Sequence, residues 1–347
     1  MLDTRQVNAV FAVEFFLCLF VIFIHVSAEG ISVGDKTGIF SGVLFFINRT
    51  LSFVVPAFIF TSALKLTLKY KDTYPSLSYY RDRVARVYLP YVVWAAIYYA
   101  YFVANNYFDF SAGDLFVYIF NGTLAAHFYF IVVIMQFYVM LPLFLFFMKK
   151  APVLTGLTVT IIMCVYRFCI PGDALIFTLL PADRWFFGYL IFWYMGSYYA
   201  FKFEECNLFV RKYAGVLLLI CGAVALPHLA FSYAGYIKIF DYTHYFELVQ
   251  ILFSAVMLCG FYVFCMLYLD RFNTFYQVTK RYIFFVFLSH ILVIFAAEDF
   301  LTDPGDCLLS KFLLKLLLTY CIPFAAAYIY DVIKKRLMNN WRSKPSF

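Results

Sequence analysis

Eight ionisable side chains lie within or at the ends of long apolar runs in this chain of 347 residues. Charged groups and imidazoles are costly to bury in lipid, so they usually face the interior of a helix bundle or a watery cavity, and they are the first candidates for function. The two deepest histidines have the strongest need for a polar partner, which favours a functional role for them. The eight residues are Glu14, His25, Arg49, His127, Arg167, His228, His290 and Lys315, and the two deepest histidines are His25 and His290.

The remaining histidines and Arg49 allow more than one interpretation. His127, His228 and His244 fall near the outer ends of apolar runs or in a connection, where a histidine is usually a hydrogen-bonded interfacial residue. Arg49 lies near the centre of its apolar run. A buried guanidinium there needs a carboxylate, backbone carbonyls or an anionic substrate. The spacing leaves open whether Arg49 meets a substrate or forms a structural ion pair with Glu14 or another helix.

Two arginines precede the third apolar run. Arg83 and Arg86 are three residues apart, so on a helix they project from one face and could hold a phosphate by forked hydrogen bonds. Anchoring of a membrane helix by basic residues on its cytoplasmic side explains the same pair. Both interpretations stay open on spacing alone.

The composition indicates which elements must position these side chains. The chain is 65% hydrophobic, 23% aromatic and only 14% charged, with a mean hydropathy of +0.84, which leaves too little polar surface for a water-soluble globule. Apolar stretches long enough to cross about 30 Å of hydrocarbon as helices recur along the chain. We expect an all-α, polytopic integral membrane helical bundle with about ten transmembrane helices. Their expected limits are 9–28, 39–63, 86–105, 127–148, 153–171, 185–201, 213–234, 245–268, 281–297 and 308–331.

The basic residues predict the orientation of the bundle. With the N-terminus inside, most of the 27 lysines and arginines fall in cytoplasmic segments, as is typical of short loops in membrane proteins. An even number of spans then makes both the N- and C-termini cytoplasmic. The triplet Val26-Ser27-Ala28 also fits a cleaved signal peptide, but Glu14 interrupts the apolar run, so we expect the first span to be retained. We expect a single transmembrane domain over residues 1–335 and a short basic cytoplasmic tail over 336–347.

Several kinds of site are not predicted. The net charge of +7 fits membrane orientation better than nucleic-acid binding. The nine cysteines include no CxxC pair and lie almost entirely in apolar runs, so we interpret them as buried apolar residues and expect neither a metal site nor a disulfide framework. The sequence also lacks the phosphate-loop, zinc and dinucleotide-binding motifs of soluble enzymes.

Five segments in order resemble the acyltransferase-3 family of polytopic membrane acyltransferases, which modify cell-surface and secreted glycans. The resemblance rests on the order of the five segments along a chain with ten expected spans. The segments are Val21-Ile22-Phe23-Ile24-His25-Val26, Val55-Pro56-Ala57-Phe58-Ile59-Phe60-Thr61-Ser62, Arg83-Val84-Ala85-Arg86 with Pro90, Tyr91 and Trp94, His127-Phe128-Tyr129-Phe130 with Gln136, Tyr138 and Pro142, and Leu288-Ser289-His290.

The resemblance implies a membrane O-acyltransferase. It would move an acyl group, with acetyl expected, from cytoplasmic acyl-CoA to a hydroxyl of a cell-surface or exported glycan. His25 would be the general base. His127, Arg49 and His290 would be further catalytic residues that stabilise the oxyanion or orient the base.

The resemblance also implies the donor site and the partners. Arg83, Arg86 and Tyr91 would bind acyl-CoA, expected as acetyl-CoA. The expected partners are the lipid bilayer of the plasma membrane, which the chain crosses many times, and a glycan or glycolipid acceptor. Polysaccharide-synthesis machinery is a further partner that the resemblance allows. One position departs from the family, which usually has Arg or Lys ten intervening residues before the first-span histidine, where this chain has Glu14. Whether Arg49 supplies the missing cation is open.

Two other functions fit the same buried polar groups. A polytopic transporter of a polar or acylated small molecule would use them, although the two related halves that are common in transporters are not evident here. A non-catalytic membrane subunit of polysaccharide synthesis would need no chemistry of its own.

Overall fold

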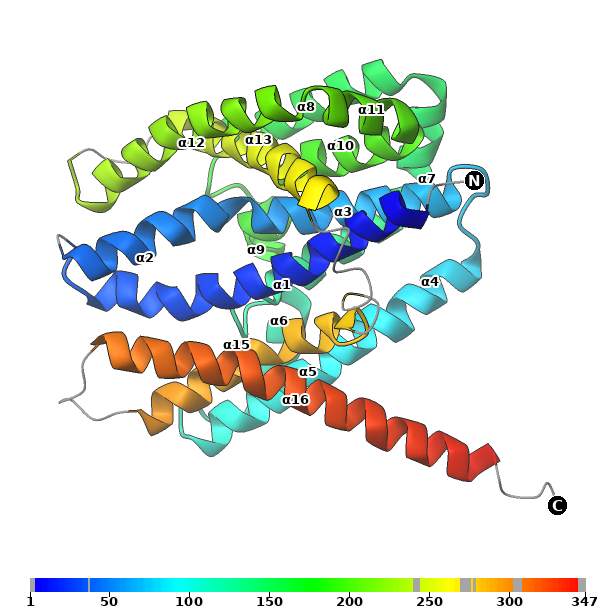
Figure 1. The fold of residues 1–347 in the computed structure, drawn as a ribbon. Coiled ribbons are helices and arrows are strands. Elements are labelled where there is room, and N and C mark those ends of the chain that lie inside the picture. The colour runs from blue at the N-terminus through cyan, green and yellow to red at the C-terminus, as the bar shows by residue number, and fades with distance from the viewer. Residues whose placement is uncertain are drawn as a thin grey trace. The chain divides into compact units, whose positions relative to one another are not determined.

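The protein is all-helical in the part of the chain that the structure describes. The structure is a computed structural model, and it describes residues 4–36, 38–239, 244–268, 276, 279–301 and 308–342. Within these ranges the regular elements are α-helices, three 3-10 turns and one π-helical turn, with no strand (Figure 1). The elements are α1 (Thr4–Val33), α2 (Ile39–Thr50), η1 (Leu51–Phe53), α3 (Val54–Tyr70), α4 (Leu77–Arg83), η2 (Val84–Tyr88), α5 (Leu89–Ala104), α6 (Ala112–Asn121), α7 (Tyr129–Lys150), α8 (Pro152–Phe168), α9 (Ile176–Leu179), η3 (Ala182–Arg184), η4 (Phe186–Tyr189), α10 (Leu190–Phe201), α11 (Phe203–Lys212), α12 (Ala214–Tyr236), α13 (His244–Tyr268), α15 (Ile283–Phe300) and α16 (Leu308–Arg342).

Eight helical segments in the described ranges are long and apolar enough to cross a membrane, so this is a multi-pass membrane protein. Each of the eight coincides with a span expected from the sequence. The two other expected spans, 153–171 and 185–201, correspond to shorter helices, the 17-residue α8 and the 12-residue α10. The eight segments are Val13–Val33, Ile39–Tyr70, Leu77–Ala104, Tyr129–Lys150, Ala214–Tyr236, Glu247–Tyr268, Ile283–Phe300 and Leu308–Arg336.

Several helix limits differ from those expected. The second segment changes from α-helix to a 3-10 turn at Leu51–Phe53, and Pro56 follows in the first turn of α3, where its missing N–H costs little. His244, expected in a loop, begins α13. The expected tail begins inside a helix, because α16 continues to Arg342, and residues 343–347 lie outside the described part.

The chain divides into two compact units, residues 1–51 with 268–347, and residues 52–267. The first unit contains α1, α2, α15 and α16. Polar groups join α1 to α2 in antiparallel order: Ser41 Oγ donates to the carbonyl of Gly30 at 3.2 Å, and Asn48 Nδ2 donates to the carbonyl of Ile24 at 3.0 Å. The hydroxyl of Tyr320 on α16 donates to the carbonyl of Leu19 at 2.9 Å. These hydrogen bonds determine which residues of α2 and α16 lie beside which residues of α1.

The second unit has an aromatic core around α10. The rings of Trp193 and Phe137 are fully buried and stack with centroids 4.5 Å apart. Gly196 lets α10 approach α3 closely, because a Cβ at this position would clash with the carbonyl of Phe60 and lie 2.9 Å from the Cβ of Ala63. The sequence therefore buries α10 although it is short, since its large side chains and its glycine fit against α3 and α7.

Candidate functional site

His25 and His290 come together in the first unit. Their ring centroids are 5.4 Å apart, with the ring planes tilted by 43°. The helices α1 and α15 that carry them run parallel, since Cys18 Sγ lies 3.8 Å from the carbonyl of Ile283, one heptad before each histidine. His25 follows Cys18 by seven residues, and His290 follows Ile283 by seven residues. Two turns along the parallel helices therefore bring the two imidazoles to the same level.

A backbone contact determines how the His290 ring is held. Nδ1 of His290 lies 2.7 Å from the carbonyl oxygen of Phe287, and the residue is fully buried. A carbonyl oxygen can only accept, so this is a hydrogen bond with the proton on Nδ1, which leaves Nε2 of the neutral ring as an acceptor. His25, by contrast, is half-buried. The pair thus combines a fixed imidazole with a more accessible one.

Arg49 belongs to the same level of the first unit as the histidine pair. Asn48 donates to Ser27 Oγ at 2.8 Å as well as to Ile24, which sets the last turn of α2 beside the turn of α1 that contains His25. Arg49 itself is half-exposed, and its guanidinium lies over the ring of Phe45 at 5.6 Å.

Glu14 lies towards the other end of α1. It is eleven residues before His25, roughly 16 Å along the helix axis, and it accepts a hydrogen bond from the hydroxyl of Tyr276. Burial, followed by the nearby Glu14 carboxylate and this hydrogen bond, raises the pKa of Tyr276. Because Asn48 is hydrogen-bonded to Ile24 and Ser27, the backbone of Arg49 lies closer to His25 than to Glu14.

The other ionisable residues that the sequence singles out have structural surroundings. Arg167 NH1 lies 3.8 Å from the carboxylate of Glu247, and its other terminal nitrogen donates to the carbonyl of Gly188 at 3.4 Å. His228 is fully buried, and its ring stacks on Phe253 at 4.0 Å. Both residues take part in the helix packing of the second unit.

The two arginines before the third span have different environments. Arg83 is half-buried, its guanidinium lies 5.3 Å from the ring centroids of both Tyr79 and Tyr138, and its buried Nε has no hydrogen-bond partner among the described residues. Arg86 is exposed and lies 3.9 Å from the Asp82 carboxylate. The turn between them, η2, is a π-helix, a conformation that is often found at functional sites. The two residues thus offer one half-buried and one exposed guanidinium group.

Two predicted site residues of the second unit are buried among aromatic rings. Tyr91 is fully buried, donates its hydroxyl to the carbonyl of Ile119 at 2.7 Å and packs on Phe128. This bond and this packing hold Tyr91 within the second unit, and its role in a donor site stays a prediction. His127 precedes α7, is 2% exposed, and packs against Phe128 and Tyr98 with ring centroids 4.4 and 5.9 Å away.

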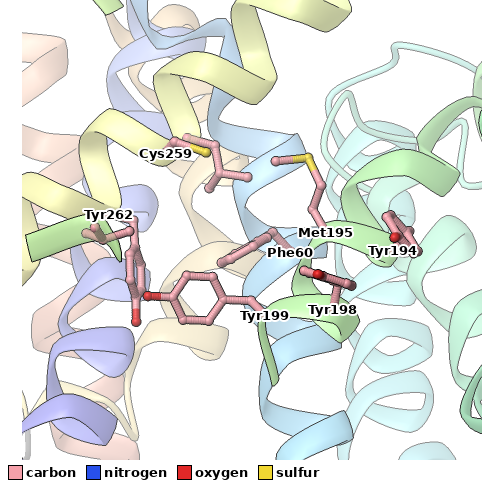
Figure 2. A pocket seen from close by; sticks show the side chains of 9 residues that line it. Phe60, Tyr194, Met195, Tyr198, Tyr199, Cys259 and Tyr262 are labelled. Atoms are coloured by element: carbon pink, nitrogen blue, oxygen red, sulfur yellow. The ribbon is translucent and has the colours of Figure 1, made fainter. Parts of the chain in front are cut away.

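The second unit also contains an apolar cavity of about 190 Å³. Figure 2 shows its walls, in which the rings of Tyr199 and Tyr262 lie beside Phe60. The hydroxyl of Tyr199 donates to Asn207 at 2.5 Å. The lining has no histidine, carboxylate or basic side chain, and its ionisable groups are tyrosine hydroxyls and the Cys259 thiol. The lining residues are Phe60, Tyr194, Met195, Tyr198, Tyr199, Val210, Leu258, Cys259 and Tyr262.

Comparisons with known proteins identify the type of domain. A family model described as an acyltransferase domain matches residues 11–330. No curated protein matches this chain, and no solved structure does. Within the described residues, no three His, Cys, Asp or Glu side chains gather as metal ligands would, and the cysteines of that part are free. The match includes every candidate residue described above.

Proposed function

We propose a specific reaction for this chain, which belongs to the acyltransferase-3 family and is therefore an acyltransferase that transfers groups other than aminoacyl groups. The chain transfers an acyl group, acetyl in the simplest case, from acyl-CoA to a hydroxyl of a cell-surface or exported glycan at the plasma membrane. The donor enters from the cytoplasm, where both termini lie. The transporter and the non-catalytic subunit are not carried forward, because the family assignment makes the chain an enzyme.

The observation that carries the proposal is the pairing of His25 with His290. His25 is the general base: its imidazole takes the proton of the acceptor hydroxyl as the hydroxyl oxygen attacks the thioester carbonyl. The carbon–sulfur bond then breaks, the ester forms, and the imidazolium returns the proton to the departing thiolate. His290 is fixed by its bond to Phe287 and holds the His25 ring in position for both transfers. Such a base typically contributes about 10²–10⁴-fold to the rate.

The remaining roles are assigned by charge. Arg83 and Arg86 bind the phosphate groups of CoA, for which the half-buried guanidinium of Arg83 and the exposed guanidinium of Arg86 are suited. Arg49, whose backbone lies at the level of His25, stabilises negative charge that develops on the thioester oxygen. His127 is a second candidate for that task.

The test uses the purified full-length chain in lipid with labelled acetyl-CoA. We expect the native protein to release or transfer the label, and His25→Ala to lose at least about 10²-fold of that rate. His228→Phe is the matched control, because it also removes an imidazole but keeps the stacked ring on Phe253, and it should retain the native rate. Full activity of His25→Ala at native protein levels would refute the catalytic assignment. Loss of base-labile esters from cell-surface polysaccharide in cells without the protein would support a glycan acceptor.

A further inference from the structure

A buried lysine joins the two helices that carry the histidine pair. Lys315 lies on α16 with its side chain only 4% exposed. Its Nζ forms an ion pair and hydrogen bond with Glu29 Oε2 on α1, and another with Glu298 Oε1 on α15 at 3.1 Å. All three residues belong to the first unit. One ammonium group therefore joins α1 and α15 through α16.

The position of this lysine cluster along the helices relates it to His25 and His290. Glu29 follows His25 by four residues, so both side chains lie on one face of α1, one turn apart. Glu298 follows His290 by eight residues, just over two turns along α15. The cluster thus lies directly beyond the histidine pair, on the same two helices, and α1 and α15 are held at that end by the lysine.

Electrostatic repulsion explains why the spacing of α1 and α15 near the histidine pair depends on Lys315. Glu29 and Glu298 approach one ammonium group, and without it two carboxylates would face each other across the α1–α15 contact. Their repulsion would separate the helices just beyond the level at which the two imidazoles meet. A small displacement of a catalytic group, of the order of 1 Å, can lower a rate by about 10²-fold.

The geometry points to Lys315 as a positioning residue for the reaction: through Glu29 and Glu298 it sets the distance between His25 and His290. The inference rests on the proposed function of His25 as the base. It assigns Lys315 no contact with either substrate. Its effect should therefore be on the chemical step, not on substrate binding.

The experiment measures kcat, KM for acetyl-CoA and the melting temperature of purified full-length variants. We expect Lys315→Met to lower kcat by about 10²-fold with KM within twofold of the native value, and Lys315→Arg, which keeps the charge and both carboxylate bonds, to restore most of kcat. Lys311→Met is the matched control, because it removes a half-buried cation four residues earlier on α16, and it should keep the native kcat.

A second pair of variants keeps the test decisive if Lys315→Met does not fold. Glu29→Gln and Glu298→Gln each leave Lys315 one carboxylate, and each should lower kcat by about tenfold at unchanged KM. Native kcat in the folded Lys315 or glutamate variants would overturn the inference. A loss of activity that Lys315→Arg does not restore, and that is fully explained by a smaller amount of folded protein, would overturn it as well. Activity in His25→Ala would instead overturn the proposed base, so the two failures are distinguishable.

Discussion

His290 holds its Nδ1 2.7 Å from the carbonyl oxygen of Phe287, one helical turn earlier on α15, while its ring faces His25 with 5.4 Å between centroids. One nitrogen of His290 is thus used by the backbone, and the other is left for the site. The two functions of the ring can be separated by substitution, because the amide nitrogen of an asparagine takes the place of Nδ1 and has no counterpart of Nε2.

His290→Asn should keep the bond to Phe287 and lose the contact with His25. We expect kcat for acyl transfer to fall roughly 10²-fold, with the melting temperature close to native, because the buried carbonyl keeps its donor. Ser289→Ala is the neighbouring control, since its hydroxyl donates within α15, to the carbonyls of Phe285 and Val286. Label transfer from acetyl-CoA measures both variants. An unchanged kcat in His290→Asn would remove His290 from the mechanism.

Much of the fold follows from hydropathy, but the pairing of helices does not. A run of apolar residues reports the transfer of one segment into lipid and carries no information about its neighbours, so the sequence located eight long spans and could not place α1 beside α15. The short helix α10 shows the other limit. Its burial depends on Gly196 and on ring packing against α3 and α7, which are tertiary properties.

The site was partly predictable for the same reason. The search for ionisable side chains in apolar runs identified His25, His290 and Lys315 one at a time. It missed the partners of Lys315. Glu29 lies one residue beyond the expected end of the first span, whereas α1 continues to Val33. The seven-residue spacing from Cys18 to His25, matched by Ile283 and His290, was a usable signal once the two helices were known to be parallel.

The exposed ion pair of Arg86 and Asp82 predicts competition with the donor. The two side chains are 3.9 Å apart and well exposed, so their attraction contributes little stability and Asp82 is available to oppose an incoming anion. We expect Arg86→Gln to raise KM for acetyl-CoA roughly tenfold at unchanged kcat, and Asp82→Asn to lower it a few-fold. Steady-state rates at several donor concentrations measure both effects.

Arg81→Gln is the control for general positive charge, because Arg81 is also exposed and lies on α4, directly before the turn that contains Arg86. It should leave KM near the native value. The contrast between Arg86→Gln and Arg81→Gln should shrink at high salt, where surface electrostatics are screened. Equal KM values for the two variants would assign Arg86 to membrane anchoring alone.

Asn48 is expected to be important for the stability of the first unit. Its amide donates to Ile24 and Ser27, and Asn48→Ala leaves both acceptors without that donor. We expect the free energy of unfolding to fall by about 1–3 kcal/mol, and kcat to fall as well, because the last turn of α2 then loses its attachment beside His25. Thermal melts of the purified protein and initial rates below the transition measure the two effects.

Thr50→Val tests whether the loss of any side-chain hydrogen bond at the end of α2 lowers the free energy of unfolding by the same amount. The Thr50 hydroxyl donates within α2, to the carbonyl of Phe46, and is exposed. We expect a change within about 0.5 kcal/mol. A similar loss in the two variants would show that the contacts of Asn48 to α1 have no special importance.

Gly196 is predicted to be the least replaceable glycine of the α3–α10 contact. A methyl group there would meet the backbone of Phe60 and the Cβ of Ala63, so Gly196→Ala must separate two helices that pack along much of their length. Overpacking of this kind costs typically about 1–3 kcal/mol, and the free energy of unfolding should fall by that amount. Gly215→Ala is matched, since Gly215 is also helical and has no atom within 4 Å of an added Cβ. It should be neutral or slightly stabilising, because alanine favours helix more than glycine does.

The comparison of these two glycine variants separates packing from helix propensity. Propensity alone predicts that both alanines stabilise the protein, whereas close contact predicts opposite signs. Gly196 takes no part in the proton transfer proposed for His25, so Gly196→Ala should lower the melting temperature without changing kcat at temperatures where the protein is folded. Equal melting temperatures for Gly196→Ala and the native chain would mean that α10 can move away from α3 at little cost, and the short helix would then owe its burial to the rings around Trp193 alone.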